Sequence, residues 1–298
     1  MERNIKLLLA YEGTDFHGWQ RQPNLRTVQG QVEQAVRRVC QHQVDVVGAG
    51  RTDAGVHAAG QVASFRTTSE IPAVNLARAI GGRLPKDITL IHAVEVPLAF
   101  HATRCARGKL YRYTIHNATG RPVERLRQRY VYHFWQHLDV ERMREAGQAF
   151  VGEQDFAAMA SKGDEREHTV RTVYSCDVYR DYDEVRIDVE GRGFLYNQVR
   201  NMVGTLIEIG RGHWPVDCIP EILASKDRRR AGPTAPARGL RMEWVRYDLN
   251  NLPGCEQNGA GVVRQDSEAA EEDAGPEWAA DSPGPDETAC ESPTSSRD

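Results

Sequence analysis

The sequence predicts an α+β protein of two related halves, each a mainly antiparallel sheet with helices on one face, with a central cleft between the halves. Two observations support this prediction. Segments rich in β-branched and aromatic residues, typical of strands, alternate with segments of helical periodicity. Each half holds several strands and at least two helices, and a loop-like stretch at residues 103–108 separates the halves. We therefore predict one half over residues 1–105 and a second over residues 106–250.

Strands are predicted where β-branched and aromatic residues gather between turn-forming residues. Such segments occur in both halves, so each half can form a sheet. They are Asn4–Tyr11, Val44–Ala49, Gln61–Thr67, Ile88–Val94, Lys109–His116, Val170–Tyr179, Glu184–Val189 and Arg241–Tyr247.

Helices are predicted where a capping residue or a proline precedes an apolar repeat. Thr27 caps a helix over Val28–Cys40, Pro72 begins one that runs towards Gly81, Asp139 caps one that reaches about Phe150, and Pro215 begins one that ends near Ser225.

The strongest helical repeat spans Phe194–Gly210. Its apolar residues recur every three or four positions and form one stripe. Arg200 lies about 100° around the helix from Val199, beside this stripe, so its head group can reach a cleft. The alternative is an ordinary surface arginine.

Bulk composition indicates a globular protein of the cytoplasm. The chain has 298 residues, 40% of them hydrophobic, which is enough for a large core. It has neither an apolar run long enough to span a bilayer nor the pattern of a secretory signal. Its six cysteines include no CxxC pair and are predicted to be free thiols.

The net charge of −4 combines two unlike parts. Residues 1–250 carry 36 Lys and Arg against 30 Asp and Glu, whereas residues 251–298 carry 2 against 12. The basic part is rich in arginine, which suits an anionic partner, although a GC-rich coding bias would give the same excess. The tail, residues 251–298, has few large apolar residues and is predicted to be disordered and acidic.

A glycine-rich segment around Asp53 is the densest functional signal. Gly48, Gly50 and Gly55 flank this carboxylate directly after a predicted strand. Glycine lets a backbone approach a ligand closely and adopt turns that other residues avoid. Taken alone, the segment also fits a tight turn with an aspartate side-chain hydrogen bond.

Five sequence blocks, in order, resemble the TruA family of tRNA pseudouridine synthases over most of residues 4–248. The chain departs from the family pattern at Gln198, where methionine is common. The matching blocks are Tyr11–Gln20 with Thr27–Gly30, Gly48–Ala58, Phe100–Ala102 with Tyr111–Tyr113, Phe194–Tyr196 with Val199–Asn201, and Thr234–Ala237 with Gly239–Leu240.

The resemblance implies a role for each matching residue. Asp53 is the nucleophile, and Arg200 pairs with it, which is expected to lower the pKa of the carboxyl group. Tyr111 stacks on the target base and is a candidate for moving the C5 proton, with Arg112 and Lys109 as phosphate-binding neighbours.

The resemblance also implies that Leu240 lies close to the bound base and that Arg51 binds the tRNA backbone. The alternative for Tyr111 is a core aromatic, since Tyr111 and Tyr113 point to one face of a strand. Arg21, Arg104 and Arg107 are weaker candidates for RNA contacts, and the resemblance assigns no chemistry to His57 or Gln20.

The implied activity is isomerisation of uridine to pseudouridine at positions 38, 39 and/or 40 of the tRNA anticodon stem-loop. The implied enzyme is a homodimer with the pseudouridine synthase fold, and it uses no metal or other cofactor. His133 and His137 lack the spacing and context of a zinc site. The alternative function is a non-catalytic tRNA-binding or chaperone protein on the same scaffold.

Overall fold

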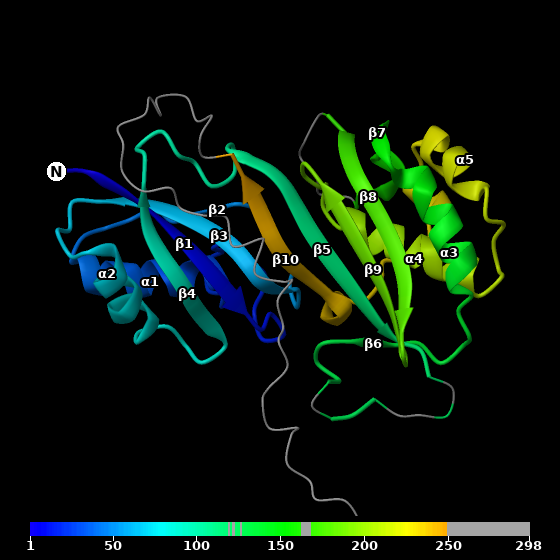
Figure 1. Ribbon diagram of the computed structural model, residues 1–298, viewed down its shortest axis with the longest axis horizontal. Coiled ribbons are helices and arrows are strands. Elements are labelled where there is room, and N and C mark those ends of the chain that lie inside the picture. Colours follow the sequence, from blue (N-terminus) through cyan, green and yellow to red (C-terminus); the bar gives the residue numbers. More distant parts are fainter. Residues whose placement is uncertain (119, 121–122, 126, 162–167, 249–298) are drawn as a thin grey trace, which may run out of the picture. The chain divides into compact units, whose positions relative to one another are not determined.

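A single ten-stranded sheet runs through both predicted halves (Figure 1). The computed structural model describes residues 1–118, 120, 123–125, 127–161 and 168–248. The strand order is β4-β1-β3-β10-β5-β9-β8-β7, with β2 beside β3 and β6 beside β5. The strands are β1 (Arg3–Tyr11), β2 (Val47–Gly48), β3 (His57–Thr67), β4 (Ile88–Val96), β5 (Ala106–His116), β6 (Tyr132–His133), β7 (Gly152–Asp155), β8 (Val170–Asp181), β9 (Glu184–Gly191) and β10 (Leu240–Tyr247).

The last described strand joins the two predicted halves. β10 pairs antiparallel with β5 and, through Arg241 and Met242, parallel with β3. Most other neighbours in the sheet pair antiparallel. The mixed α+β class and the mainly antiparallel sheet are therefore confirmed. The boundary between residues 105 and 106 and the central cleft stay predictions.

Capping residues begin two helices where the sequence predicts them. The Thr27 side chain accepts a hydrogen bond from the Gly30 amide at the start of α1, and Asp139 accepts one from the Arg142 amide at the start of α3. Such caps satisfy amides that have no partner inside the helix. The helices are α1 (Val28–Cys40), α2 (Ala73–Gly81), α3 (Val140–Gly147), α4 (Gln198–Gly210) and α5 (Cys218–Ser225).

Several predicted element boundaries were wrong, including the starts of β3 and β5, which begin at His57 and Ala106 rather than Gln61 and Lys109. Helix α4 begins at Gln198 rather than Phe194, because Asn197 has a left-handed φ of 60° and the Gln198 side chain binds the Leu195 amide. Helix α5 begins at Cys218, three residues after Pro215. The strand predicted over residues 44–49 is reduced to the two residues of β2.

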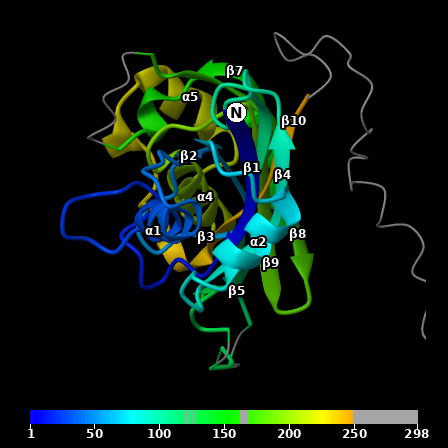
Figure 2. The same cartoon turned by 90° about the vertical axis from the view of Figure 1, so that its left-hand side faces the viewer.

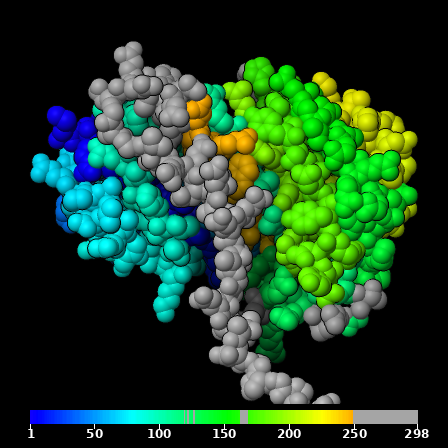
Figure 3. All heavy atoms as spheres, viewed as in Figure 1, coloured from blue at the N-terminus to red at the C-terminus, as the bar shows by residue number. Residues whose placement is uncertain are grey.

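The helices lie on one side of the sheet, as Figure 2 shows for α1, α4 and α5. Alternate residues of the strands, such as Leu7 and Ile187, share one hydrophobic core with residues of all five helices. A smaller core around Phe100 and Tyr247 lies against the N-terminal half. In Figure 3, which looks onto the face away from the helices, the yellow-green atoms of β8 and β9 reach the surface.

No helix among the described residues is long and apolar enough to cross a membrane. The predicted tail, residues 251–298, lies outside the described residues.

Candidate active site

Asp53 lies in a tight turn between β2 and β3. The Val56 amide donates to the Asp53 carbonyl at 3.1 Å, and the Trp19 amide donates to the Thr52 carbonyl at 3.0 Å. Gly55 has a φ of +80°, a conformation that favours glycine. Gly18, also at positive φ, lies so close that a Cβ there would be 2.6 Å from the Thr52 carbonyl oxygen. Glycine is thus required where the segment at residues 18–19 crosses the loop.

Arg200 reaches this loop from α4. Its Nη1 lies 3.2 Å from Asp53 Oδ2, and the two side chains are 16% and 21% exposed. Arg200 is also held by the Asn197 side-chain oxygen at 2.8 Å and by the Ala235 carbonyl, which accepts from Nε at 2.7 Å. Three acceptors therefore fix the guanidinium before any substrate binds, which is the arrangement that a pre-organised site requires.

Helix α4 is buried on almost every side. All of its residues except Arg200 are buried, so the predicted single apolar stripe was too narrow a description. A Cβ at Gly204 would lie 1.7 Å from the Pro233 carbonyl oxygen, so the chain can pass α4 here only over glycine. This close approach brings Ala235 to Arg200.

The pKa of Asp53 is raised, whereas the sequence predicted that Arg200 would lower it. Burial disfavours the charged carboxylate and is the largest effect, and the charge and hydrogen bond of Arg200 offset only part of it. The expected pairing is therefore correct and the expected net direction was wrong. Arg200 therefore reduces, but does not cancel, the destabilisation of the ionised Asp53 carboxylate by burial.

Tyr111 lies on β5 beside this pair. Its ring is 7% exposed and meets the Phe194 ring edge-on, with centroids 5.4 Å apart. Burial, followed by the nearby Tyr11 and Asp53, raises the pKa of the Tyr111 phenol, so its hydroxyl stays protonated at neutral pH. Tyr111 thus places a neutral hydroxyl close to the carboxylate, while its ring packs in the hydrophobic core, as the core alternative expects, and stacking on a base stays a prediction.

The neighbours of Tyr111 do not form the predicted phosphate-binding group. Arg112 is bound to Asp188, with Nε–Oδ1 at 2.8 Å and Nη2–Oδ2 at 2.7 Å. Lys109 is buried, and its Nζ donates to the Ala49 carbonyl at 2.8 Å. Tyr113 is a core residue, fully buried, with its hydroxyl donating to the Pro236 carbonyl. The core alternative is therefore correct for Tyr113.

Leu240 and Arg51 lie near the Asp53 loop in different environments. Leu240 begins β10 and is buried opposite Tyr113. The residues just before it touch the loop, since a Cβ at Gly55 would lie 3.2 Å from the Ala237 Cβ. Arg51 is exposed, as a residue that binds an RNA backbone must be.

Of the weaker candidates, Arg104 and Arg107 are also exposed. Arg21 forms an ion pair with Glu33.

Comparison with known proteins matches the chain to the family described as tRNA pseudouridine synthase, over residues 8–103 and 146–248. tRNA pseudouridine synthase A of Acetivibrio thermocellus is 45% identical over 245 residues, covering 82% of this chain and 100% of that protein. The chain belongs to the tRNA pseudouridine synthase family. tRNA pseudouridine synthase A of Moorella thermoacetica is also 45% identical, covering 82% of this chain and 99% of that protein.

A solved Cbf5-Nop10-Gar1 complex is similar at 13% identity and a TM-score of 0.31, covering 80% of this chain and 57% of that chain. A likeness this low supports no statement about this chain.

Other residues of this family site were missed by the sequence analysis. Asn197 and Ala235 hold Arg200, and both lie in or beside the matching blocks, but a side-chain amide and a backbone carbonyl give no signal of this role in a sequence. His57 received no role, and the structure gives it one. The Gly13 amide donates to its Nδ1, and its Nε2 contacts the Arg129 carbonyl, so it ties two loops together.

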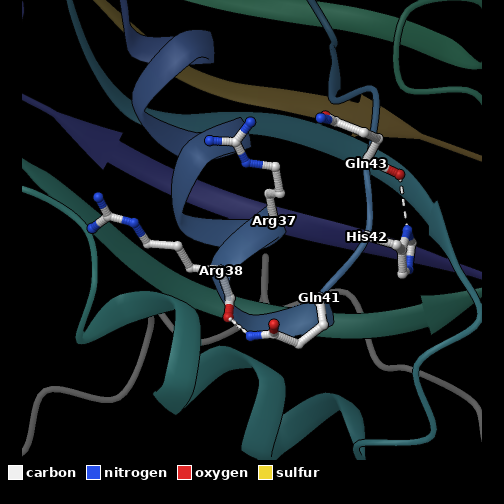
Figure 4. Close-up of a pocket in the computed structure, with 5 residues that line it drawn as sticks. All are labelled: Arg37, Arg38, Gln41, His42 and Gln43. Carbon is white, nitrogen blue, oxygen red and sulfur yellow. Dashed lines mark hydrogen bonds between the residues drawn. The ribbon is translucent and has the colours of Figure 1, made fainter.

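The hollow in Figure 4, about 460 Å³, lies at the C-terminal end of α1 and contains none of the predicted site residues. It is lined by Arg37, Arg38, Gln41, His42 and Gln43. The Gln41 amide donates to the Arg38 carbonyl, and His42 Nδ1 contacts the Gln43 carbonyl. The lining has no carboxylate. The two arginines lie in the last turn of α1, where a positive charge interacts favourably with the helix dipole, so they need no ligand to account for their position.

A metal site is not suggested by the described residues either, which bring no three His, Cys, Asp or Glu side chains together for an ion.

Proposed function

We propose that this protein isomerises uridine to pseudouridine at positions 38, 39 and/or 40 of the tRNA anticodon stem-loop. The observation that supports the proposal most directly is the Asp53–Arg200 ion pair beside Tyr111. A half-buried carboxylate held by a fixed guanidinium is suited to covalent catalysis, because it is oriented and largely shielded from water.

The reaction needs one nucleophile and two proton movements. Asp53 forms a transient covalent bond with either C1′ of the ribose or C6 of the uracil. The N1–C1′ bond breaks, the uracil turns, and a C5–C1′ bond forms. The bond to Asp53 breaks as C5 takes its place at C1′, or when C6 releases the carboxylate, so the free carboxylate is restored. C5 then loses its proton and N1 carries one, so the product has the atoms of the substrate. This isomerisation has no net oxidation or reduction, and we propose no metal or other cofactor.

The remaining side chains bind and position the uridine. We propose that Tyr111 stacks on the uracil, which must leave its place in the RNA stack, and that its neutral hydroxyl relays the C5 proton, accepting it while it passes its own proton to the released Asp53 carboxylate. Leu240 contacts the base, and Arg51 binds the RNA backbone. We further propose that the enzyme is a cytoplasmic homodimer in which tRNA contacts both subunits.

The Asp53→Asn variant tests the nucleophile. Asparagine keeps the size of the side chain and an acceptor for Arg200 but cannot form the covalent bond. We expect it to bind tRNA and to form no pseudouridine, whereas Asp45→Asn, which removes an exposed carboxylate nearby, keeps activity. Full activity of Asp53→Asn would exclude the proposed nucleophile.

The wild-type protein tests the alternative function. Pseudouridine should be mapped in tRNA treated with the protein, which also identifies the modified positions. If the wild-type protein bound tRNA and formed no pseudouridine, the non-catalytic tRNA-binding alternative would replace the enzyme.

A further inference from the structure

The loop that carries Asp53 is held by buried polar side chains that have no assigned role. Gln61, on β3, is fully buried and donates from Nε2 to the Gly50 carbonyl at 2.8 Å. Tyr11, on β1, is 5% exposed and shares a hydrogen bond with the Thr52 hydroxyl at 2.8 Å. These bonds grip the residues on both sides of exposed Arg51, immediately before Asp53.

The two gripping side chains are linked to each other. Gln61 Nε2 also lies 3.4 Å from the Tyr11 hydroxyl, within hydrogen-bond distance. Both residues stand on central strands of the sheet, which hold a side chain more firmly than a loop does. The group of Tyr11, Gln61 and Thr52 therefore connects the catalytic loop to a rigid support.

An irregularity in the sheet places this group. Leu9 pairs with Gln61, but Tyr11, two residues later, pairs with Ala58, so β3 carries an extra residue at this point. Such a bulge redirects side chains and is common beside active sites. Gly60 lies in the bulge, where a Cβ would be 2.3 Å from the Glu243 carbonyl oxygen, so β10 packs directly on it.

Gln61 is also costly to bury. Its Oε1 is buried and has no hydrogen-bond partner among the described residues. A buried acceptor without a donor destabilises the folded state, and an apolar side chain of the same size would avoid this cost. The Gln61 amide oxygen therefore destabilises the fold, whereas the amide N–H group binds the Gly50 carbonyl and holds the loop.

We propose that Tyr11 and Gln61 are positioning residues, which hold the Gly50 carbonyl and the Thr52 side-chain hydroxyl so that Asp53 faces Arg200 and the target nucleotide. Gln61 acts through the loop alone, and Tyr11 acts through it by way of Thr52. The Tyr11 hydroxyl also lies close enough to Tyr111 to raise the pKa of that phenol, an effect that Gln61→Met and Thr52→Val leave in place. The inference rests on the proposed function, because its measure is the rate of pseudouridine formation. A misplacement of about 1 Å in a reacting group can cost about 100-fold in rate.

The first test separates kcat from KM in Tyr11→Phe and Gln61→Met. Phenylalanine keeps the ring and loses only the hydroxyl, and methionine keeps the volume of Gln61 and loses the amide. We expect kcat to fall by about tenfold or more in each, with KM within about twofold of the wild-type value. The control is Tyr247→Phe, because Tyr247 is similarly buried and donates to the Ala102 carbonyl at 2.7 Å in the smaller core.

The control distinguishes positioning from stability. Tyr247→Phe should lower Tm about as much as Tyr11→Phe and leave kcat unchanged. If Tyr11→Phe and Gln61→Met also kept the wild-type kcat, or raised KM alone, the proposal would be overturned.

A double-mutant cycle tests the link between Tyr11 and Thr52. Thr52→Val keeps the shape of threonine and removes its hydroxyl, and Thr52→Ser restores a hydroxyl. We expect Tyr11→Phe combined with Thr52→Val to lose little more kcat than either change alone, and Thr52→Ser to recover most of the loss seen in Thr52→Val. Additive losses would show that the two residues act separately and would overturn the proposed link.

If Tyr11→Phe fails to fold, the cycle cannot be completed. The kcat values of Thr52→Val and Gln61→Met then still test the positioning of the loop, each by itself. Wild-type protein is assayed alongside throughout. An inactive wild type would count against the proposed function, whereas an active wild type with unaffected variants would count against the positioning role alone.

Discussion

The Asp53 carboxylate and the Arg200 guanidinium meet at 3.2 Å although 147 residues separate them in the chain. Both groups are mostly buried, and burial raises the pKa of Asp53 more than Arg200 lowers it. The folded protein thus holds a carboxylate in a place that disfavours its charge. Arg200 controls how far the carboxylate is ionised at a given pH, which ties catalysis and stability to the same pair.

The first prediction concerns the pH dependence of stability. Because folding raises the pKa of Asp53 above its usual value of 3.8, the folded state holds this proton more tightly than the unfolded state. The contribution of Asp53 is therefore most favourable below that value and is lost as pH rises through the folded pKa. Relative to Asp53→Asn, wild-type protein should gain unfolding free energy as pH falls from 7 to about 3.5.

Denaturant unfolding of both proteins across this pH range measures the difference, with Asp45→Asn as the control for an exposed carboxylate. A wild-type protein that instead lost stability relative to Asp53→Asn on acidification would show that Arg200 lowers the pKa of Asp53 overall.

The second prediction concerns the acid limb of the rate profile. The nucleophile must be ionised, so kcat/KM should fall as pH drops through the pKa of Asp53. Arg200→Gln removes the charge that lowers this pKa, so the limb should move to higher pH and kcat should fall about tenfold or more. Arg200→Lys keeps a charge but cannot bind Asp53, Asn197 and Ala235 together, and should lie between the two.

Profiles of kcat/KM against pH for the three proteins check this order. Arg246→Gln changes an exposed arginine of β10 that forms an ion pair with Glu190, so it is the control and should leave the limb in place. A limb that stayed at the wild-type pH in Arg200→Gln would remove Arg200 from the control of Asp53.

Much of the site could be predicted because its signals are local. Thr27 and Asp139 mark helix starts by capping. The glycines around Asp53 indicate a turn because their backbone preferences do not depend on distant parts of the chain. The residue blocks that resemble the family carried Arg200 and Tyr111, which no periodicity would have placed beside Asp53.

The remaining features depend on contacts that a sequence does not display. The direction of the Asp53 pKa shift depends on burial by distant segments. Arg112 binds Asp188, rather than being free for RNA, because β9 pairs with β5. Helix α4 is buried on nearly all sides because several distant segments cover it, with residues 232–233 passing over Gly204 and Met143 of α3 lying against Gly210. The joining of both halves through β10 likewise follows from long-range pairing.

The third prediction separates the two roles of Tyr111. Tyr111→Phe keeps the ring and its packing on Phe194 but removes the hydroxyl, so kcat should fall strongly while KM stays within about twofold. Tyr111→Leu removes the stacking surface as well and should also raise KM, since stacking on one base is worth about 1–3 kcal/mol. Single-turnover rates and tRNA binding measure the two effects.

Tyr113→Phe is the matched control on the same strand. It removes the hydrogen bond to Pro236 and should reduce stability by about 1 kcal/mol with a smaller effect on the rate. If Tyr111→Phe turned over as fast as wild type, the proton would move through another group.

The fourth prediction concerns Arg51, which is exposed beside the catalytic loop and has no ion pair with the residues that the structure describes. A guanidinium that neutralises one RNA phosphate releases about 0.7–0.9 of a counterion, so log K for binding depends on log salt with a slope that counts such contacts. Arg51→Gln should weaken tRNA binding and make that slope shallower by about 0.7–0.9, while kcat at saturating tRNA stays near the wild-type value. Arg246→Gln removes the same charge from an exposed arginine of β10, which forms an ion pair with Glu190, and should leave the slope unchanged. Because a general loss of positive charge would affect both variants equally, an unchanged slope in Arg51→Gln, or an equal change in both, would show that Arg51 makes no phosphate contact of its own.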